Sequence, residues 1–449
     1  MVVRAYLLAL ALSLLGSGSA SAAASEPAPQ PELRLSLHDA IEAALDNNPK
    51  VRMLKEQIQT AQGIADTSRG ALLPNLSGFV NQRNQTVNLA TFGIPSDKLS
   101  SLGIGSGGVT APFNVFDARA TIVQNLFSLS LLQRWHAART GVDVASLEAE
   151  ITRRDTMATV ALLYMEALRA EAAVKAGEAN VELGQRLLKL AQDRKKAGVA
   201  TGLDVTREQV HLENEKQRLL VAQSDRDGSK LNLIRVLGID FDIRLTLTDE
   251  LKLVEIEGRH AHEILASARE NRVELKAQAT REKLAALSLS SITSERLPSL
   301  NFNGDYGWIG LKADDAIGTR TVGVTLSVPI LDGGQREGRI SEGRSKVRQE
   351  SIRMKDVSDQ VTLEVRNALI TLVSSRQQVS VAEEGLKLAH KELEQAQDRF
   401  AAGVANNIEV TNAQTSVARA RDNVIEALFR FNASRVNLAR AEGQLETLY

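Results

Sequence analysis

Residues 191–206 read AQDRKKAGVATGLDVT and residues 396–411 read AQDRFAAGVANNIEVT, so ten of sixteen positions are identical at a spacing of 205 residues. An earlier pair of matches lies at a spacing of 224, between Leu73-Pro74-Asn75-Leu76 and Leu297-Pro298-Ser299-Leu300. Recurrence at a fixed spacing indicates an internal two-fold repeat. The fall in spacing between the two pairs (224 − 205 = 19) places an insertion of that length in the first copy.

Proline and glycine positions predict that each copy holds a long helical hairpin. No proline lies between Pro112 and Pro298, or after Pro329, so helices over about 129–197 and 334–402 can run unbroken. At 1.5 Å per residue each would be roughly 100 Å long. Gly198 and Gly403 then end these helices, and shorter helices return over about 203–237 and 408–441.

The apolar spacing within the long helices is typical of coiled-coil packing. It steps by three and four along a seam that comprises Leu386, Ala389, Leu393, Ala396 and Phe400, and a matching seam in the first copy comprises Val181, Gly184, Leu188 and Ala191.

Short segments before each long helix alternate in the way that strands do. Val322, Val324 and Leu326 alternate with small polar residues, and the aromatic Phe302, Tyr306 and Trp308 share one face of the preceding segment. This predicts one hairpin over about 300–331, with a loop over 312–320, and a counterpart over about 76–127. The counterpart has a longer loop over 84–114, rich in glycine and serine, which holds the insertion and is typical of a mobile surface loop.

Composition excludes several classes of function. The chain has 449 residues and no cysteine, so disulfides, thiolate nucleophiles and cysteine-bound metals are impossible. The balance of 54 basic and 55 acidic residues gives no basic field for nucleic acid. The six histidines are scattered. We therefore expect no enzyme activity, catalytic residue, cofactor or metal site.

The N-terminus is predicted to be a secretory signal peptide. Arg4 precedes an apolar run from Ala5 to Leu15, and Ala20-Ser21-Ala22 forms a small-residue cleavage site. The run of about eleven residues is shorter than the ~20 that span a bilayer. The expected division is a signal peptide over 1–22 and a proline-rich leader over 23–36, followed by a first repeat over 37–240, a connecting segment over 241–260 and a second repeat over 261–449.

The strand pattern also fits a membrane barrel, in which one face meets lipid and the other meets water. Four strands cannot close a barrel, and open strand edges are not tolerated in lipid, so several chains would have to share one sheet. Two chains give eight strands with a filled interior, so a passage needs at least three. The alternative is a half-buried soluble hairpin in a periplasmic coiled-coil scaffold that conducts nothing.

The order of these segments resembles the TolC-like outer membrane efflux proteins over nearly all of the mature chain. The motifs that carry the resemblance are the turn Val328-Pro329-Ile330-Leu331-Asp332-Gly333-Gly334 and the two tips, at 197–205 and 402–410. The resemblance implies a mainly α fold with a small β part. Three chains would form an α-helical barrel continued by a shared twelve-stranded transmembrane β-barrel.

The resemblance also implies partners and a place in the cell. A homotrimer would lie in the outer membrane of a Gram-negative-type envelope, in contact with its lipid, and extend into the periplasm. It would meet a periplasmic adaptor protein and, through it, an inner membrane transporter, and would export small molecules or proteins.

The same resemblance assigns candidate site residues. Adaptor docking falls on the tips, at Gly198, Val199, Ala200, Thr201, Gly202 and Leu203, and at Gly403, Val404, Ala405, Asn406, Asn407 and Ile408. Gate candidates are Asp204, Glu409 and Asn412. Phe302, Tyr306, Trp308, Val322, Val324 and Leu326 would face lipid.

The two gate carboxylates have an alternative role. A ring of Glu409 in three chains would favour cations at a narrow mouth. Asp204 and Glu409 also stand in the first turns of the return helices, where the positive end of the helix dipole stabilises acidic side chains.

Overall fold

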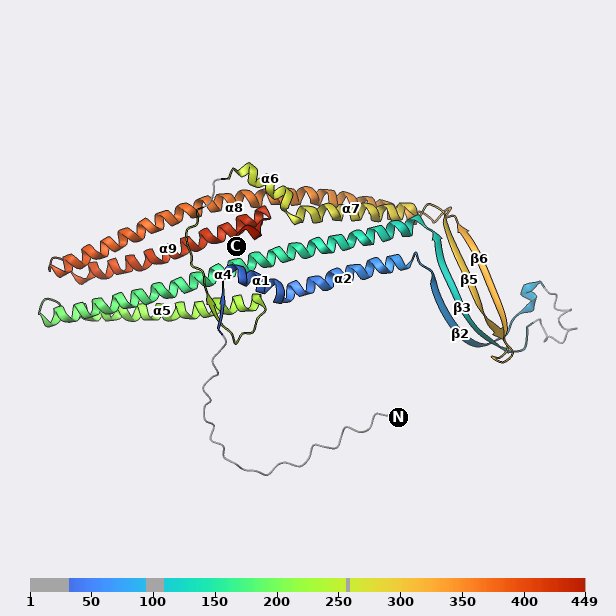
Figure 1. The fold of residues 1–449 in the computed structure, drawn as a ribbon, viewed down its shortest axis with the longest axis horizontal. Coiled ribbons are helices and arrows are strands. Elements are labelled where there is room, and N and C mark those ends of the chain that lie inside the picture. The colour runs from blue at the N-terminus through green and yellow to red at the C-terminus, as the bar shows by residue number, and fades with distance from the viewer. Residues whose placement is uncertain (1–31, 94–108, 256–258, 449) are drawn as a thin grey trace, which may run out of the picture.

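The computed structural model describes residues 32–93, 109–255 and 259–448 of the chain. The molecule is elongated, with its helices along the long axis (Figure 1). Four long strands lie at one end, and the tips of two helical hairpins lie together at the other. The predicted signal peptide, and residues 94–108 of the glycine- and serine-rich loop, lie outside the described residues.

Two long helices run most of the length of the helical part. Helix α4 spans Leu129–Lys196, and α8 spans Gln335–Ala401. Each is followed by a 36-residue return helix, α5 over Gly202–Leu237 and α9 over Asn407–Glu442. The prediction of long unbroken helices is confirmed, with bounds close to those expected from proline and glycine alone.

Glycine in the left-handed region ends each long helix, as the sequence predicts. Gly198 has φ +76° and Gly403 has φ +74°. In the first tip the N–H of Val199 donates to the carbonyl of Arg194 at 3.0 Å, and in the second Val404 donates to Arg399 at 3.1 Å. These six-to-one bonds satisfy carbonyls that the helix end leaves free, and glycine adopts the required φ without a Cβ clash.

Shorter helices precede each hairpin and match in pairs. Helices α1 (Leu37–Asn47) and α6 (Ala261–Asn271) each have 11 residues, and α2 (Pro49–Gly70) and α7 (Val273–Ser294) each have 22. Both pairs keep the larger of the two spacings found in the sequence (261 − 37 = 224 and 273 − 49 = 224). Helix α2 lies beside α4, and α7 lies beside both α4 and α8. Helix α2 leads into the first strand of its hairpin, and α7 leads into the first strand of the other (Figure 1).

The strands form one open antiparallel sheet in the order β2-β3-β5-β6. They span Asn75–Gln85, Phe113–Phe127, Ser299–Gly310 and Ile317–Ser327. Two expected limits of β6 are wrong. It begins at Ile317, inside the expected loop, because it pairs with β5 up to Ile309. It also ends at Ser327, although the alternation continues to Ile330.

A second, two-stranded sheet was missed by the sequence analysis. Strand β1 (Glu32–Leu35), placed in the expected leader, pairs in parallel with β4 (Arg244–Leu247) of the connecting segment. The signal was present but short, because each strand alternates only two leucines with polar residues. Two 3₁₀ turns, at Leu89–Phe92 and Leu445–Leu448, complete the described elements.

The core is distributed along the helices. A central cluster packs α4 against α1, α5 and α9, and its fully buried members include Met157, Tyr164 and Leu233. Near the tips, Ala389, Leu393, Ala396 and Phe400 pack against α9 and Leu187, as the predicted seam requires. In the first copy Leu187, rather than the expected Leu188, is the buried leucine.

Candidate functional site

The sheet has one apolar and one polar face. The pairing places Phe302 opposite Val324 and Leu300 opposite Leu326, so these apolar side chains share a face. On the other face Asn303 lies opposite Gly323 and Asp305 opposite Thr321. Of the residues predicted to face lipid, five are exposed: Tyr306 at 56%, Trp308 at 49%, Val322 at 71%, Val324 at 59% and Leu326 at 63%. Phe302 is half-buried.

An aromatic pair stands on the apolar face near the hairpin end of the sheet. The rings of Tyr306 and Trp308 meet edge to face, with centroids 5.3 Å apart. Arg320 lies opposite Tyr306. Aromatic rings with a polar neighbour at one end of an apolar band are typical of the membrane–water interface.

A charge cluster lies on the polar face. Arg119 Nε donates to Asp117 Oδ1 at 2.7 Å, and its NH1 nitrogen donates to Asp305 Oδ1 at 3.0 Å. The guanidinium also stacks on Phe79 at 5.9 Å from the ring centroid. Gly307 lies opposite Arg119, and a Cβ there would be 2.2 Å from the Arg119 Cβ. The arginine is therefore held flat against the sheet, and sequence reasoning did not identify it.

The two helical tips lie side by side at the far end of the molecule (Figure 1). Four large apolar side chains of the predicted docking set are exposed: Val199 at 61%, Leu203 at 57%, Val404 at 69% and Ile408 at 43%. Gly198, Thr201, Gly202, Gly403 and Asn406 are also exposed, and Ala200 and Ala405 are half-buried. The tips thus present a small apolar surface on a polar helix end.

Asp204 closes a capping box in the first tip. Its Oδ2 accepts from the Thr201 N–H at 2.8 Å and from the Thr201 hydroxyl at 2.7 Å, while its own N–H donates back to the hydroxyl at 3.3 Å. These hydrogen bonds lower the pKa of the Asp204 carboxyl. Asp204 therefore stabilises the start of α5.

Glu409 is arranged differently in the second tip. It is exposed, and its Oε2 accepts from Arg399 Nε of α8 at 3.1 Å. Asn406, rather than Glu409, caps α9 through the N–H of Ile408 at 3.0 Å. Asn412 is exposed one turn further on. The structure therefore pairs Glu409 with a cation and leaves Asn412 open to solvent.

Asn407 belongs to the predicted docking set, but it is only 2% exposed. Its Nδ2 donates to Glu208 Oε1 of α5 at 2.9 Å and to the backbone oxygen of Asp204 at 3.4 Å. Glu208 is 1% exposed and also lies 3.0 Å from the Thr411 hydroxyl. Asn407 thus joins the two tips instead of facing a partner. No local signal in the sequence indicates this contact, because Glu208 lies 199 residues away on another helix.

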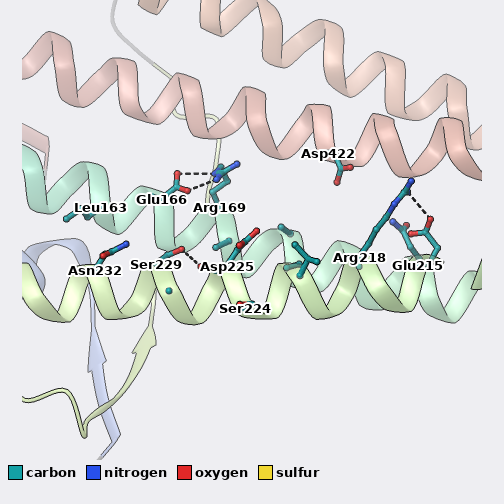
Figure 2. A pocket seen from close by; sticks show the side chains of 17 residues that line it. Leu163, Glu166, Arg169, Glu215, Arg218, Ser224, Asp225, Ser229, Asn232 and Asp422 are labelled. Atoms are coloured by element: carbon teal, nitrogen blue, oxygen red, sulfur yellow. Dashed lines mark hydrogen bonds and ion pairs between the residues drawn. The ribbon is translucent and has the colours of Figure 1, made fainter. Parts of the chain in front are cut away.

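A charged cavity of about 670 Å³ lies between α4 and α5, farther from the tips, and Asp422 of α9 also lines it (Figure 2). Arg169 pairs with Glu166 on its own helix and with Glu426 of α9. Arg218 pairs with the buried Glu215 at 2.9 Å. Within the cavity wall Arg169 and Arg218 each have a carboxylate partner, and Asp225 and Asp422 also line the cavity.

Two further observations concern the described residues alone. None of their helices combines the length and the apolar character needed to cross a membrane. They also contain no group of three or more histidine, aspartate or glutamate side chains placed to hold a metal ion.

Comparison with known proteins identifies the family. The model of the outer membrane efflux protein family matches residues 40–239 and 264–444, which covers both copies of the helix–hairpin–helix unit. The chain belongs to the outer membrane efflux protein family. This confirms the resemblance that the two tips and the post-strand turn indicated.

Individual members of the outer membrane efflux protein family are similar over most of their length. Protein CyaE of Bordetella pertussis is 24% identical over 92% of this chain and 84% of its own. The outer membrane protein TolC of Vibrio cholerae is 22% identical over 91% of both chains. The crystal structure of the Campylobacter jejuni CmeC outer membrane channel superposes with a TM-score of 0.78 at 15% identity, over 91% of this chain and 86% of that one. That likeness shows the fold.

Family membership decides the broad function. Outer membrane efflux proteins are channels of the Gram-negative outer membrane and not enzymes, so the protein is a channel-family member of that membrane. The mainly helical fold with a few strands agrees with the predicted fold class. Efflux and secretion channels both occur in the family.

Proposed function

We propose that three copies of this chain form a continuous duct that exports small molecules or proteins across the outer membrane. The observation that carries the proposal is the open sheet, in which β2 and β6 are free edges and one face is apolar and exposed. In lipid, unpaired N–H and C=O groups at these edges would cost several kcal/mol each. Because strand directions alternate across the sheet, β6 of one copy can pair antiparallel with β2 of the next.

The number of copies follows from the size of the passage. Two copies would give eight strands, whose interior side chains fill, whereas three give twelve and leave a lumen. The polar face, with Arg119 and its two aspartates, would line that lumen. The apolar face, with Val322, Val324 and Leu326, would meet outer membrane lipid.

The helical part supports the same assembly. Leu168 of α4 is 4% exposed and belongs to a buried cluster that includes residues of α9, whereas Val373, its counterpart on α8 in the second copy, is 58% exposed. Likewise Val436 of α9 is 1% exposed, and its counterpart Leu231 of α5 is 48% exposed. We assign the covering of α8 to α5 of a neighbouring copy. Four hairpin helices from each of three copies then form a twelve-helix tunnel.

The tips are the proposed contact with a periplasmic adaptor, and through it with an inner membrane transporter. Val199, Leu203, Val404 and Ile408 form an exposed apolar surface rimmed by polar residues, which is typical of protein interaction sites. Asn407 is withdrawn from this set because it is buried between the tips.

Asp204, Glu409 and Asn412 are the proposed lining of the tunnel mouth. Glu409 is the one to test, because its carboxylate is exposed and its Arg399 partner is on the same tip. We expect Glu409→Gln to change single-channel conductance, or its pH dependence, in planar bilayers, since it removes one charge per chain from the mouth. Glu213→Gln, which alters an exposed carboxylate paired on its own helix, is the matched control. An unchanged response in both variants would leave Glu409 only its pairing with Arg399.

Conductance and fractionation test the function itself. The full chain should be recovered in the outer membrane fraction, require detergent for extraction and give ion conductance in planar bilayers. Recovery from the soluble periplasm without detergent would contradict the duct and favour the scaffold.

A further inference from the structure

Three of the four residues after β6 carry exposed apolar side chains in irregular backbone. Val328 is 54% exposed, Ile330 is 91% exposed and Leu331 is 88% exposed. Val328 and Ile330 continue the alternation of β6, but none of the three residues continues its pairing, because β5 begins opposite Ser327. Apolar side chains exposed to this degree beside a free strand edge indicate a missing partner.

The first repeat of the chain shows what the counterparts of these residues do when a partner strand is present. Leu76 and Leu300 are counterparts in the repeated Leu-Pro-x-Leu motif, and they pair with Ile122 and Leu326 respectively. Ile122 therefore corresponds to Leu326, which sets the offset between β3 and β6 (326 − 122 = 204). By this offset, residues 124–127 of β3 correspond to residues 328–331.

Residues 124–127 belong to β3 because β5 lies beside them. Gln124 pairs with Phe302, and Phe127 pairs with Leu300 after a bulge between Asn125 and Phe127. Strand β6 is an edge strand, and among the described residues no strand lies beside it on the side away from β5. Residues 328–331, the counterparts of 124–127, therefore stay unpaired. The difference between the two copies is the presence of a partner strand.

We infer that β6 extends through residues 328–331 on assembly and pairs with β2 of the neighbouring copy in the register that β3 keeps with β5. The inference rests on the proposed trimer and specifies which residues pair where the sheets of two neighbouring copies meet. The pair Thr121–Asp305 in the β3–β5 register corresponds to Thr325 opposite Asn81 of the neighbouring copy. In the same way, the pair Phe127–Leu300 corresponds to Leu331 opposite Leu76 of the neighbouring copy.

The transferred register is chemically consistent. Thr325 and Asn81 both belong to the polar face, and Leu331 meets Leu76, which is 75% exposed in the single chain. Ile330 takes the place of the bulged Leu126. Pro329, which has no N–H to donate, stands beside that bulge, a position that strands tolerate. The pairing thus places Leu331 beside Leu76 on the lipid-facing side, at the helical end of the barrel.

Engineered cysteine pairs test the register, because the chain has no cysteine of its own. We expect Asn81→Cys with Thr325→Cys, and Leu76→Cys with Leu331→Cys, to give disulfide-linked dimers and trimers on non-reducing gels. Directly opposed residues have Cα atoms about 4.5–5.5 Å apart, within disulfide range. Ser77→Cys with Thr325→Cys is the control, since Ser77 shares the face but lies four positions, or roughly 13 Å, from Asn81.

Each outcome has a separate meaning when the mass of the unmodified assembly is measured in parallel. Cross-linking of the control pair in place of the Asn81–Thr325 pair, in a protein that is still trimeric, would overturn the register. Cross-linking at Asn81–Thr325 but not at Leu76–Leu331 would overturn the strand extension. A monomeric mass would instead overturn the proposed trimer.

Discussion

At the scale of single residues, a few buried polar groups fix how the elements meet. Tyr164 is fully buried on α4, and its hydroxyl lies 2.8 Å from Asp249 Oδ2 and 3.0 Å from the Leu35 carbonyl. Asp249 also accepts the Leu37 N–H at 2.8 Å. Burial, together with the bond to Asp249, raises the pKa of Tyr164. One phenol therefore ties the small parallel sheet and α1 to the longest helix.

Tyr164→Phe should destabilise this junction. It removes a hydrogen bond to a charged group, which is worth about 1.5–3 kcal/mol. The thermal midpoint followed by circular dichroism should fall. Tyr306→Phe, at a 56% exposed site, is the control and should leave the midpoint unchanged. Equal midpoints for both variants would contradict a structural role for the Tyr164 hydroxyl.

The Asp204 capping box makes a pH-dependent prediction. Because its pKa is lowered in the folded tip, Asp204 stabilises the tip above its ordinary value of 3.8, and this stabilisation is lost as pH falls through the folded pKa. Asp204→Ala should reduce hydrogen-exchange protection of the first tip about fivefold at pH 7, since such caps contribute about 1 kcal/mol. The difference from wild type should vanish at the lowest pH. Asp193→Ala, across the same tip, is the control, and a difference that persists in acid would refute the assignment.

At the scale of elements, the two faces of the sheet should respond differently to charge. Val324→Lys puts an ammonium on the apolar face, where it costs about 2–4 kcal/mol near the bilayer midplane. We expect loss of assembled protein from the outer membrane. Thr325→Lys, one residue along on the polar face, should assemble normally and change conductance. Equal assembly of both variants would contradict the assignment of the faces.

The sequence predicted elements where a local signal was strong. Gly198 and Gly403 marked the tips, and the absence of proline allowed α4 and α8 to be predicted almost to the residue. Strands β1 and β4 were missed because four residues give only two alternations. The end of β6 was misplaced because Val328 and Ile330 keep the strand pattern, whereas β5 begins opposite Ser327 and offers no partner beyond it.

The tip residues show a similar limit. Their exposure was predictable from position, but the burial of Asn407 depends on Glu208, which lies 199 residues away on another helix. Likewise, Arg119 reads as an ordinary polar residue of a strand until β5 brings Asp305 beside it. Contacts between distant segments decide these roles, and no local pattern encodes them.

At the scale of the whole molecule, a single chain leaves several surfaces uncovered. The free edges of β2 and β6, the apolar residues of α8 and the exposed side chains after β6 all lie where the internal repeat predicts another copy. Within one chain the two repeats cover part of each other's surfaces. In the proposed trimer, contacts between neighbouring chains would repeat this arrangement and cover the rest. The proposed duct therefore depends on the number of chains around the passage.

The mass of the detergent-solubilised, full-length assembly measures that number. Native mass spectrometry after detergent removal in the gas phase should give three times the mass of the mature chain. A mass of one or two chains would contradict the proposed trimer, because neither four nor eight strands can enclose the duct.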